Sequence, residues 1–412
     1  MSTPRFLQFH LLTPYAASLL NRDDAGFAKR IPFGGSTRTR ISSQCLKRHW
    51  RTFAGKHAFA ELGAPPTMRS RLTFERHVAQ PLIDSGVDAE RAREVTVQIV
   101  KEVLGFNADR AKAKASKAKK SDDAVEETPE DPSVKTDQVT VLGQPELDYI
   151  LAQAKEICAE LASDANEKAI TKAVKEHFGR EGKANMQAIA KGAGLSAALF
   201  GRMVTSDNLA RCDAAIHVAH AFTVHEQEAE SEFFSAVDDL ISADGELGSG
   251  HIGTTELTSG LFYGYVAIDL PLLLSNLAGD VDLAAGVIER LTWIMATASP
   301  GAKLGSTAPY AYANLVLAES GSSQPRSLAN AFGKAVRRTK DESLQQVTQK
   351  ALAEHLSQLD GMYGAGTERC ISALEDISPL AKDIGVKGSI PLAELATWAA
   401  AQAKAAAAKG AA

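Results

Sequence analysis

The segment RTRISSQCLKRHWR, residues 38–51, contains the densest group of side chains that could bind a ligand. Its first residues alternate as in a β-strand, so Arg38 and Arg40 lie on the same side, two positions apart. Ser42 or Ser43 then caps a helix, whose free N–H groups and dipole favour an anion by about 0.3–1 kcal/mol. This strand–helix corner therefore predicts a site for a negatively charged ligand.

The helix that follows the cap adds positive charge to the same corner. Lys47 and Arg51 lie four residues apart on one helical face, with Arg48 beside them. Residues 25–60 contain no acidic residue and eight basic ones, namely Lys29, Arg30, Arg38, Arg40, Lys47, Arg48, Arg51 and Lys56. An ordinary solvated face would include some carboxylates to balance this charge, so the pattern favours a phosphate backbone as the ligand.

The charge of the whole chain is distributed unevenly. The 412 residues include 45 Lys and Arg and 50 Asp and Glu, a net charge of −5, which argues against a generic nucleic-acid binder. Outside residues 25–60 the balance is 37 basic residues against 50 acidic ones, or −13. The chain thus combines one strongly positive surface with an otherwise acidic body.

Two adjacent aromatic residues, Phe233 and Phe234, precede a long excursion rich in Gly and Ser. At the base of a projecting loop they could wedge between bases, where stacking contributes about 1–3 kcal/mol per base. Alternatively, one ring lies in the core and the other at an interface. The spacing leaves both interpretations open.

The remaining motifs do not predict a cofactor or a metal. GSGHIG, residues 248–253, matches the dinucleotide pattern G-x-G-x-x-G, but it lacks the strand before and the helix after that this pattern needs, so a mobile glycine loop is expected. YGYVAI, residues 263–268, matches only the centre of the aromatic RNP1 strand of RNA-recognition modules, and a sheet face packed by tyrosines explains it equally well. His217 and His220 would lie on opposite faces of a strand, which favours structural roles.

Length and composition predict an ordinary globular protein of two or three parts. Hydrophobic residues make up 45% of the chain and charged residues 23%, as in typical globular domains. No apolar run approaches the roughly eighteen residues of a membrane span, and the apolar stretch at the N-terminus is too broken for a signal peptide. Four cysteines without a C-x-x-C pair argue against a disulfide framework. A cytoplasmic location is therefore expected.

Hydrophobic periodicity predicts a mixed fold. Residues 5–13 form a buried strand, residues 36–44 alternate like a strand, and residues 45–62 have helical periodicity. Beyond residue 199 strands alternate with helices, one of them predicted at 326–338. Residues 67–199 are helical except for a charged block at about 108–140, in which six basic residues are followed by six acidic ones, typical of a flexible surface insertion. This order predicts an α+β sandwich of ferredoxin-like type with an inserted helical lobe.

Several longer blocks resemble the backbone subunits of type I-E CRISPR surveillance complexes (Cascade), which belong to the RAMP superfamily. The resemblance covers most of the chain and fails mainly in the charged insertion, the helical lobe and the C-terminal tail. The matching blocks are LNRDD (residues 20–24), FGG with RTRISSQCLKR (33–48), GRMVTS (201–206), and HVAHAFTVH, FFSAVDD, GSGHIGTTELTSGLFYGY and PGAK (within 217–303).

This resemblance implies an α+β protein shaped like a hand. A modified ferredoxin-like or RRM-like palm would carry an inserted helical finger domain and a projecting thumb loop. The implied divisions are the first part of the palm (1–61), the finger domain with the insertion (62–210), a palm strand (211–226), the thumb loop (227–258), the second part of the palm (259–390) and an Ala-rich tail (391–412). The composition of the tail from Trp398 onward predicts a solvated or frayed helix.

The resemblance also implies roles for single residues. Lys303 would contact the RNA backbone, and Asp24 would be structural or interfacial in the basic corner. Guide phosphates would be held by Ser42, Ser43, Gln44, Lys47, Arg48 and Arg51, together with Arg38 and Arg40 of the preceding strand. A wedge around a displaced nucleotide would be formed by Met203, Phe233, Phe234, Ser235 and Ile252.

The implied function is non-catalytic binding of a CRISPR guide RNA. Copies would stack head to tail along the guide, each thumb displacing one nucleotide, and would present the bases between for pairing with target DNA. The implied partners are the guide RNA, the target DNA, copies of the same chain and the other Cascade subunits, with no membrane, cofactor or metal. Because guides vary in sequence, the protein would hold phosphate and sugar while base pairing reads the sequence.

An enzymatic alternative comes from the wider superfamily, in which related backbone proteins cut bound RNA with an aspartate in the first loop. Asp23 and Asp24 lie in such a place and could hold a divalent ion beside a phosphate. They could instead pair with the neighbouring Arg22 or Lys29. A nicotinamide or flavin oxidoreductase that uses residues 248–253 is a third hypothesis.

Overall fold

The computed structural model describes residues 3–105, 133–162, 164–190, 194–202, 212–237 and 249–410. The chain divides into two compact units. The sheet unit comprises Met1–Leu62, Ile216–Leu274 and Asp280–Ala412, and the helical unit comprises Gly63–Ala215 and Ser275–Gly279.

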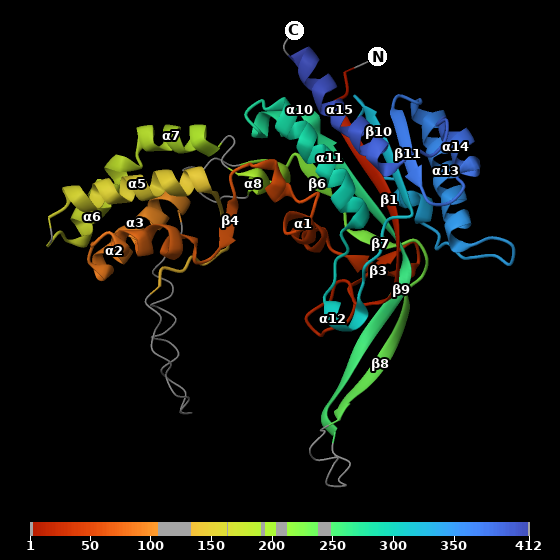
Figure 1. Cartoon of the computed structure of the whole chain (residues 1–412), viewed down its shortest axis with the longest axis horizontal. Coiled ribbons are helices and arrows are strands. Elements are labelled where there is room, and N and C mark those ends of the chain that lie inside the picture. Colours follow the sequence, from red (N-terminus) through yellow and green to blue (C-terminus); the bar gives the residue numbers. More distant parts are fainter. Residues whose placement is uncertain are drawn as a thin grey trace. The chain divides into compact units, whose positions relative to one another are not determined.

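The sheet unit is built on a nine-stranded antiparallel sheet (Figure 1). Its central strand β9, Ser249–Asp269, pairs with β1, Phe6–Ser18, along one edge and with β6, β7 and β8 along the other. The main path runs β11-β10-β1-β9-β7-β3-β2. The other strands are β2 (Arg30–Phe33), β3 (Ser36–Ile41), β6 (Ile216–Val218), β7 (Ala221–Thr223), β8 (Glu228–Val237), β10 (Leu315–Gly321) and β11 (Glu368–Ala373).

Helices cover both faces of this sheet. Alternate side chains of β1 point to opposite faces, and those on each face are buried against a different set of helices. Leu12 packs in a cluster with Leu352 of α13, whereas Leu11 lies with Trp50 of α1 and Met295 of α11 around a small apolar cavity. The helices that begin in this unit are α1 (Ser43–Arg51), α10 (Leu270–Asn276), α11 (Val281–Thr297), α12 (Leu304–Thr307), α13 (Leu344–Tyr363), α14 (Ser378–Ile384) and α15 (Leu392–Gly410), with 3-10 turns η1 (Phe59–Leu62) and η3 (Ala329–Phe332).

A buried polar network crosses four neighbouring strands of the sheet. His10 of β1 is hydrogen-bonded to the Tyr263 hydroxyl of β9 at 2.9 Å and to the Glu319 carboxylate of β10 at 3.1 Å. Arg369 of β11 donates from Nε to the same carboxylate at 2.8 Å and binds Asp360 of α13 through both terminal nitrogens. The network ties the sheet to α13 through charged groups.

The helical unit has a separate hydrophobic core. Its helices pack around fully buried residues such as Phe74, Ile99 and Ile150. The elements are a two-stranded sheet of β4 (Thr67–Ser70) and β5 (Thr140–Gly143), a π-helix η2 (Glu75–Ala79), and helices α2 (Gln80–Asp84), α3 (Ala89–Leu104), α5 (Gln144–Glu160), α6 (Glu167–His177), α7 (Arg180–Ala190) and α8 (Leu195–Phe200).

Within the described ranges, no single helix has the length and apolarity of a membrane span, although the bent pair Leu270–Asn276 and Val281–Thr297 meets those criteria jointly.

The predicted α+β class is confirmed, and the strands at residues 5–13 and 36–41 are present. Two predicted helices are shorter than their periodicity suggests. The helix predicted through residues 45–62 ends at Arg51, and Gly55, with φ of 138°, adopts a conformation that helices do not contain. The helix predicted at 326–338 is reduced to η3, since the Val336 N–H instead donates to the Val224 carbonyl at 3.0 Å.

The predicted thumb loop, residues 227–258, is largely a two-stranded β-ribbon instead (Figure 1). β8 pairs with the first half of β9 from Glu228 opposite Ser259 to Val237 opposite Ser249, and residues 238–248 lie outside the described residues. Both strands carry polar residues on both faces, so the two-residue hydrophobic period that signals a strand is absent. The ribbon is held together by hydrogen bonds between backbone groups. These bonds do not depend on residue type, so they leave no pattern in the sequence.

The solvated or frayed helix predicted from Trp398 onward is also corrected. α15 packs on α11, and Leu395, Ala396, Ala399 and Ala403 are fully buried. Alanine is apolar but too small to give a strong hydrophobic period, so the sequence does not distinguish a packed helix from a solvated one.

Only one end of the predicted charged insertion, residues 108–140, falls within the described residues. There Val134 is buried, its N–H donates to the Glu75 carboxylate at 2.7 Å, and β5 begins at Thr140. Residues 133–140 are therefore part of the folded helical unit. The rest of the predicted insertion lies outside the residues that the structure describes.

Candidate nucleic-acid interface

Helix α1 positions most of the predicted phosphate-binding residues. The Ser42 hydroxyl accepts a hydrogen bond from the Cys45 N–H at 3.3 Å, which confirms Ser42 as the helix cap. The Ser42 N–H in turn donates to the Asn21 side chain at 2.9 Å. Leu46 and Trp50 are buried, so these anchors fix which face of the helix is turned outward.

The outward face of α1 is polar and positively charged. Gln44 and Arg48 are exposed, and Lys47 and Arg51 are half-buried. The first turn contains no acidic residue, so the positive end of the helix dipole has no carboxylate of the helix itself to neutralise it. An anion can therefore approach α1 from this side.

His220 lies next to this positive charge and was assigned only a structural role by the sequence. Its Nδ1 accepts a hydrogen bond from the Ser43 N–H at 3.3 Å and lies 3.3 Å from a guanidinium nitrogen of Arg40. Partial burial lowers the pKa of His220, and the nearby charges of Arg40, Lys29 and Lys47 lower it further. No local pattern could reveal this contact, because 177 residues separate His220 from Ser43.

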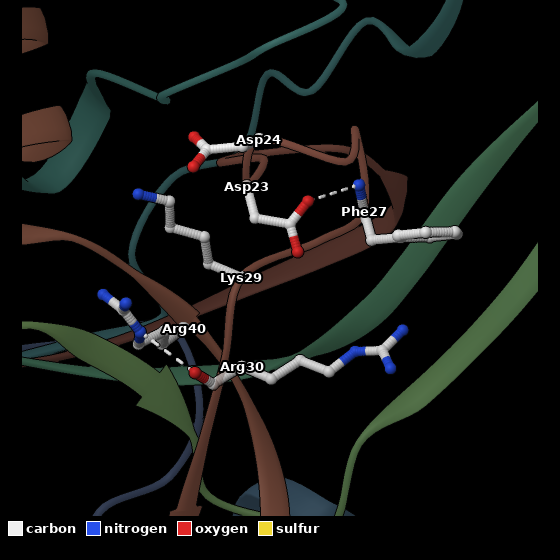
Figure 2. Close-up of a pocket in the computed structure, with 6 residues that line it drawn as sticks. All are labelled: Asp23, Asp24, Phe27, Lys29, Arg30 and Arg40. Carbon is white, nitrogen blue, oxygen red and sulfur yellow. Dashed lines mark hydrogen bonds between the residues drawn. The ribbon is translucent and has the colours of Figure 1, made fainter.

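A hollow of about 440 Å³ lies beside β3 and is lined by Asp23, Asp24, Phe27, Lys29, Arg30 and Arg40. Figure 2 shows that the Asp24 carboxylate, the Lys29 amine and the Arg40 guanidinium point to one side, while the Phe27 ring and the Arg30 guanidinium extend to the other. Phe27 is about half exposed, at 51%. The hollow thus combines cations, two carboxylates and an accessible aromatic ring. Cations and aromatic rings are groups that contact nucleotides.

The loop that forms this hollow is held by specific hydrogen bonds. Asp23 Oδ1 accepts from the N–H groups of Ala25 and Phe27 at 3.0 and 2.9 Å. Glu256 of β9 accepts from the Ala28 N–H at 2.7 Å and pairs with Arg30. These bonds fix the loop against the base of the ribbon.

Asp23 and Asp24 do not form the ion pairs considered from the sequence. Among the described residues neither carboxylate has a basic partner within 4.0 Å, so the predicted alternatives Arg22 and Lys29 are not bonded to them. Asp23 is engaged by backbone N–H groups, whereas Asp24 is exposed.

Arg38 does not reach the interface, so the predicted contact between Arg38 and phosphate is wrong. Its side chain is completely buried. The guanidinium donates to the carbonyls of Thr223, Val224 and Phe332 at 3.1, 2.7 and 3.0 Å. Arg38 and Arg40 do share a side of β3, but the turn at Phe332 covers Arg38, while Arg40 remains partly exposed.

The ribbon separates the two adjacent phenylalanines. Successive residues of a strand point to opposite faces, so Phe233 and Ser235 project from one face and Phe234 from the other. Phe233 is 65% exposed. The Phe234 ring lies over Gly253, where an added Cβ would be 2.5 Å from the ring. Of the predicted wedge, Phe233 and Ser235 are therefore together, and Phe234 is not on their face.

Lys303 approaches the Phe234 side of the ribbon. Its amine donates to the Thr255 hydroxyl of β9 at 2.8 Å and lies 4.5 Å from the centre of the Phe234 ring, in a cation–π contact. The resemblance implies that Lys303 contacts the RNA backbone. In the structure it connects the loop before α12 to the ribbon.

Two predicted wedge residues have no described side chain. Met203 lies outside the described residues. Ile252 is described only by its backbone, which pairs with Ser235 across the ribbon.

Comparisons with known proteins agree with this arrangement. Residues 7–398 match the model of the CT1975-like protein family. A solved chain described as "CRISPR RNA-guided surveillance complex, pre-nicking" is 27% identical with a TM-score of 0.73, and the match covers 96% of this chain and 100% of that one. A second, from a "CRISPR RNA-guided surveillance complex", is 24% identical with a TM-score of 0.64 over 96% and 99% of the two chains, and it supports the fold. No curated protein matches the sequence.

Proposed function

The chain belongs to the CT1975-like protein family, and from this premise we propose that it is a CRISPR-associated RNA-binding subunit of a surveillance complex of the Cascade type. The similar chain with 27% identity comes from an RNA-guided surveillance complex and aligns over its full length. This likeness supports a role as one subunit of such an assembly.

The observation that carries the proposal is the basic corner of the sheet unit, defined as Lys29, Arg40, Lys47 and Arg48. Their charges converge around His220 and Cys45. Burial lowers the pKa of His220, and the charges of Arg40, Lys29 and Lys47 lower it further. Burial raises the pKa of Cys45, and the charges of Arg48 and Lys29 partly oppose this rise. A surface of this kind on a chain of net charge −5 attracts phosphates without contacting base edges. Such binding is independent of sequence, as a protein that holds variable guides requires.

The finer proposal is a non-catalytic scaffold of type I-E. Copies of the chain would assemble head to tail along the guide RNA, and the β8–β9 ribbon of each would interrupt the run of bases at regular intervals. The bases between the ribbons would then pair with target DNA. Two features support this proposal: the ribbon extends beyond the sheet (Figure 1), and the exposed Phe233 ring offers a surface for stacking on a displaced base.

The experiment is co-expression of the tagged chain with a CRISPR array and the other subunits, followed by native mass spectrometry. We expect the chain to copurify with RNA of one defined length and to be present in several copies per RNA. A purified chain that remains a monomer free of RNA under these conditions would contradict the proposal.

A metal-dependent ribonuclease is the second candidate, because two adjacent carboxylates lie beside cations in one hollow. It is tested by incubating the complex with complementary RNA and Mg²⁺. Regularly spaced cuts that disappear with Asp24→Ala would establish the nuclease and rule out the non-catalytic scaffold. Intact RNA in the presence of Mg²⁺ would favour the scaffold.

A further inference from the structure

We infer that the Asp24 carboxylate accepts a hydrogen bond from a ribose 2′-hydroxyl of the bound strand, and that this contact selects RNA over DNA. The inference rests on the proposed function, because it assumes that the basic corner holds a nucleic-acid backbone. It assigns to Asp24 a role that differs from the structural or interfacial one expected from the sequence.

The position of Asp24 is unusual for a carboxylate. It is exposed in the hollow whose cations include Lys29 and Arg40, and in Figure 2 its carboxylate points to the same side as their charged groups. Among the described residues it has neither an ion-pair nor a hydrogen-bond partner. An acid that neutralised one of these cations would be paired with it, so balancing charge within the protein does not explain its place.

The backbone around Asp24 is preorganised. The preceding Asp23 carboxylate accepts two backbone N–H groups, from Ala25 and Phe27. The Asp23 N–H also donates to the Phe27 carbonyl at 2.8 Å, and Gly26 takes a φ of 91° that closes the turn. The turn therefore presents Asp24 at a fixed point, which is what a specific contact requires.

The chemistry of the bound strand leaves one suitable partner for this carboxylate. A phosphate is excluded, because two negative groups repel each other. A base amino group would make binding depend on sequence, which a holder of variable guides must avoid. The ribose 2′-hydroxyl is a donor present in every nucleotide of RNA and absent from DNA. With phosphates on Lys29 and Arg40, the Asp24 carboxylate, which points to the same side of the hollow, is placed to accept from the sugar.

The test compares two strands of one sequence, RNA and its fully 2′-fluoro analogue, which keeps the ribose pucker but has no 2′ hydrogen-bond donor. Binding of each labelled strand to the full chain is measured by fluorescence anisotropy. We expect the wild type to prefer RNA by about tenfold, the effect of one hydrogen bond to a charged group. Asp24→Ala should reduce this preference to nearly one, and Asp24→Asn should retain part of it.

Three controls separate the alternatives. Asp341→Ala removes an exposed acid outside the hollow and should leave the preference unchanged. Lys29→Ala should weaken binding of both strands by the same factor. Thermal melting of each variant shows that the fold is retained, which is expected because Asp24 is exposed and unpaired.

The outcomes are distinguishable. A wild type that binds RNA but shows no preference over the 2′-fluoro strand overturns the inference and leaves the proposed function standing. An Asp24→Ala variant that keeps the full preference for RNA also overturns the inference and leaves the proposed function standing. The same holds for an Asp24→Ala variant whose only defect is in assembly or in Mg²⁺-dependent cleavage. A wild type that binds neither strand contradicts the proposed function itself.

Discussion

The guanidinium of Arg38 donates hydrogen bonds to three backbone carbonyls in the interior of the sheet unit. Two of these carbonyls belong to Thr223 and Val224, at the end of β7, and the third to Phe332 in η3. Arg38 is completely buried, so in the folded chain bulk water does not reach these carbonyls. Arg38 is thus a structural residue that happens to carry charge.

Replacing Arg38 should destabilise the fold. Arg38→Ala leaves several buried acceptors unpaired and is expected to reduce the free energy of unfolding by at least about 3 kcal/mol. The matched variant Arg48→Ala removes the same charge from the surface and should change stability by less than about 0.5 kcal/mol. Urea unfolding of both variants measures the difference, and equal stability of the two would show that the buried bonds are not needed.

Glu319 is a buried carboxyl group that should make folding sensitive to acid. Burial raises its pKa, but hydrogen bonds and charges of His10 and Arg369 outweigh burial and hold the pKa well below the ordinary value of 4.5. The carboxyl therefore binds a proton less readily in the folded chain than in the unfolded one. Its contribution to stability is complete above about pH 4.5 and is lost as the pH falls toward the folded-state pKa.

Because the pKa of Glu319 is lower in the folded chain than in the unfolded one, stability should depend measurably on pH. Between pH 6 and pH 3 the wild type should lose about 2 kcal/mol more stability than Glu319→Gln, which has no carboxyl to protonate at that position. Glu319→Gln should itself be less stable at neutral pH, because Arg369 loses a charged partner. The control Glu368→Gln, an exposed neighbour on β11, should follow the wild-type pH curve, and parallel curves for all three proteins would contradict the assignment.

At the residue scale, residue type and spacing could predict that a basic corner exists and that Ser42 caps α1. They could not predict which arginine is exposed. Arg38 and Arg40 are equivalent in a strand pattern, and the turn at Phe332 that buries one of them lies 294 residues away in the chain. His220 was missed for the same reason, since its contact with Ser43 depends on tertiary packing.

The β8–β9 ribbon is contacted on one face by the side chain of Lys303. Lys303 links it to the loop before α12 through Thr255 and the Phe234 ring, and Phe234 in turn covers Gly253. Cation–π contacts of this kind contribute about 0.5–1 kcal/mol at exposed sites, enough to bias the direction of a two-stranded ribbon.

Lys303→Ala should therefore loosen the ribbon without removing a phosphate contact. Hydrogen exchange of β8 and the first half of β9 should become faster, while the dependence of RNA affinity on salt should keep its slope. If Lys303 instead binds a phosphate, as the sequence implies, the slope will fall by about 0.7 and exchange in the ribbon will not change. The two measurements together show whether Lys303 stabilises the ribbon or contacts RNA.

Helix α1 is the element that should set the salt dependence. The double variant Lys47→Ala with Arg51→Ala should weaken RNA binding equally for all sequences and flatten the salt slope by about 0.7 for each lost phosphate contact. The double variant Lys382→Ala with Lys387→Ala removes two exposed charges elsewhere and serves as the matched control. If RNA affinity depends on salt with equal slopes in the two double variants, α1 does not bind the RNA phosphates.

At the element scale, strands with a buried hydrophobic pattern, such as β1, could be predicted from the sequence, and the ribbon and α15 could not. The ribbon exposes polar groups such as Glu230 and Glu232, so its pairing leaves no hydrophobic period. α15 buries alanines, whose pattern is too weak to reveal a packed face.

For the whole molecule, the separation into two units has a direct consequence for folding. The helical unit has a core of its own, which among the described residues contains 21 buried hydrophobic residues, from Phe74 to Met186. A unit with its own core folds alone in general. Residues 63–215 are therefore expected to fold as an isolated fragment.

Expression of residues 63–215 tests this expectation. The fragment should show helical circular dichroism and a cooperative thermal transition. Ile99→Asp, which places a charge in the core, should abolish the transition, whereas Lys155→Asp at an exposed position should preserve it. A wild-type fragment without a cooperative transition would show that the helical unit needs the sheet unit to fold.

The buried network of His10, Tyr263, Glu319 and Arg369 also limits how the strands can align. Most of β1 is buried on both faces, so hydrophobicity alone barely distinguishes the native alignment of this strand from one displaced by a single residue. Such a displacement turns every side chain of the strand to the opposite face and would leave the Glu319 carboxylate or its partners charged and alone in the interior, at a cost of several kcal/mol. The charged network therefore disfavours a misaligned sheet. The apolar residues around it do not discriminate between the two alignments.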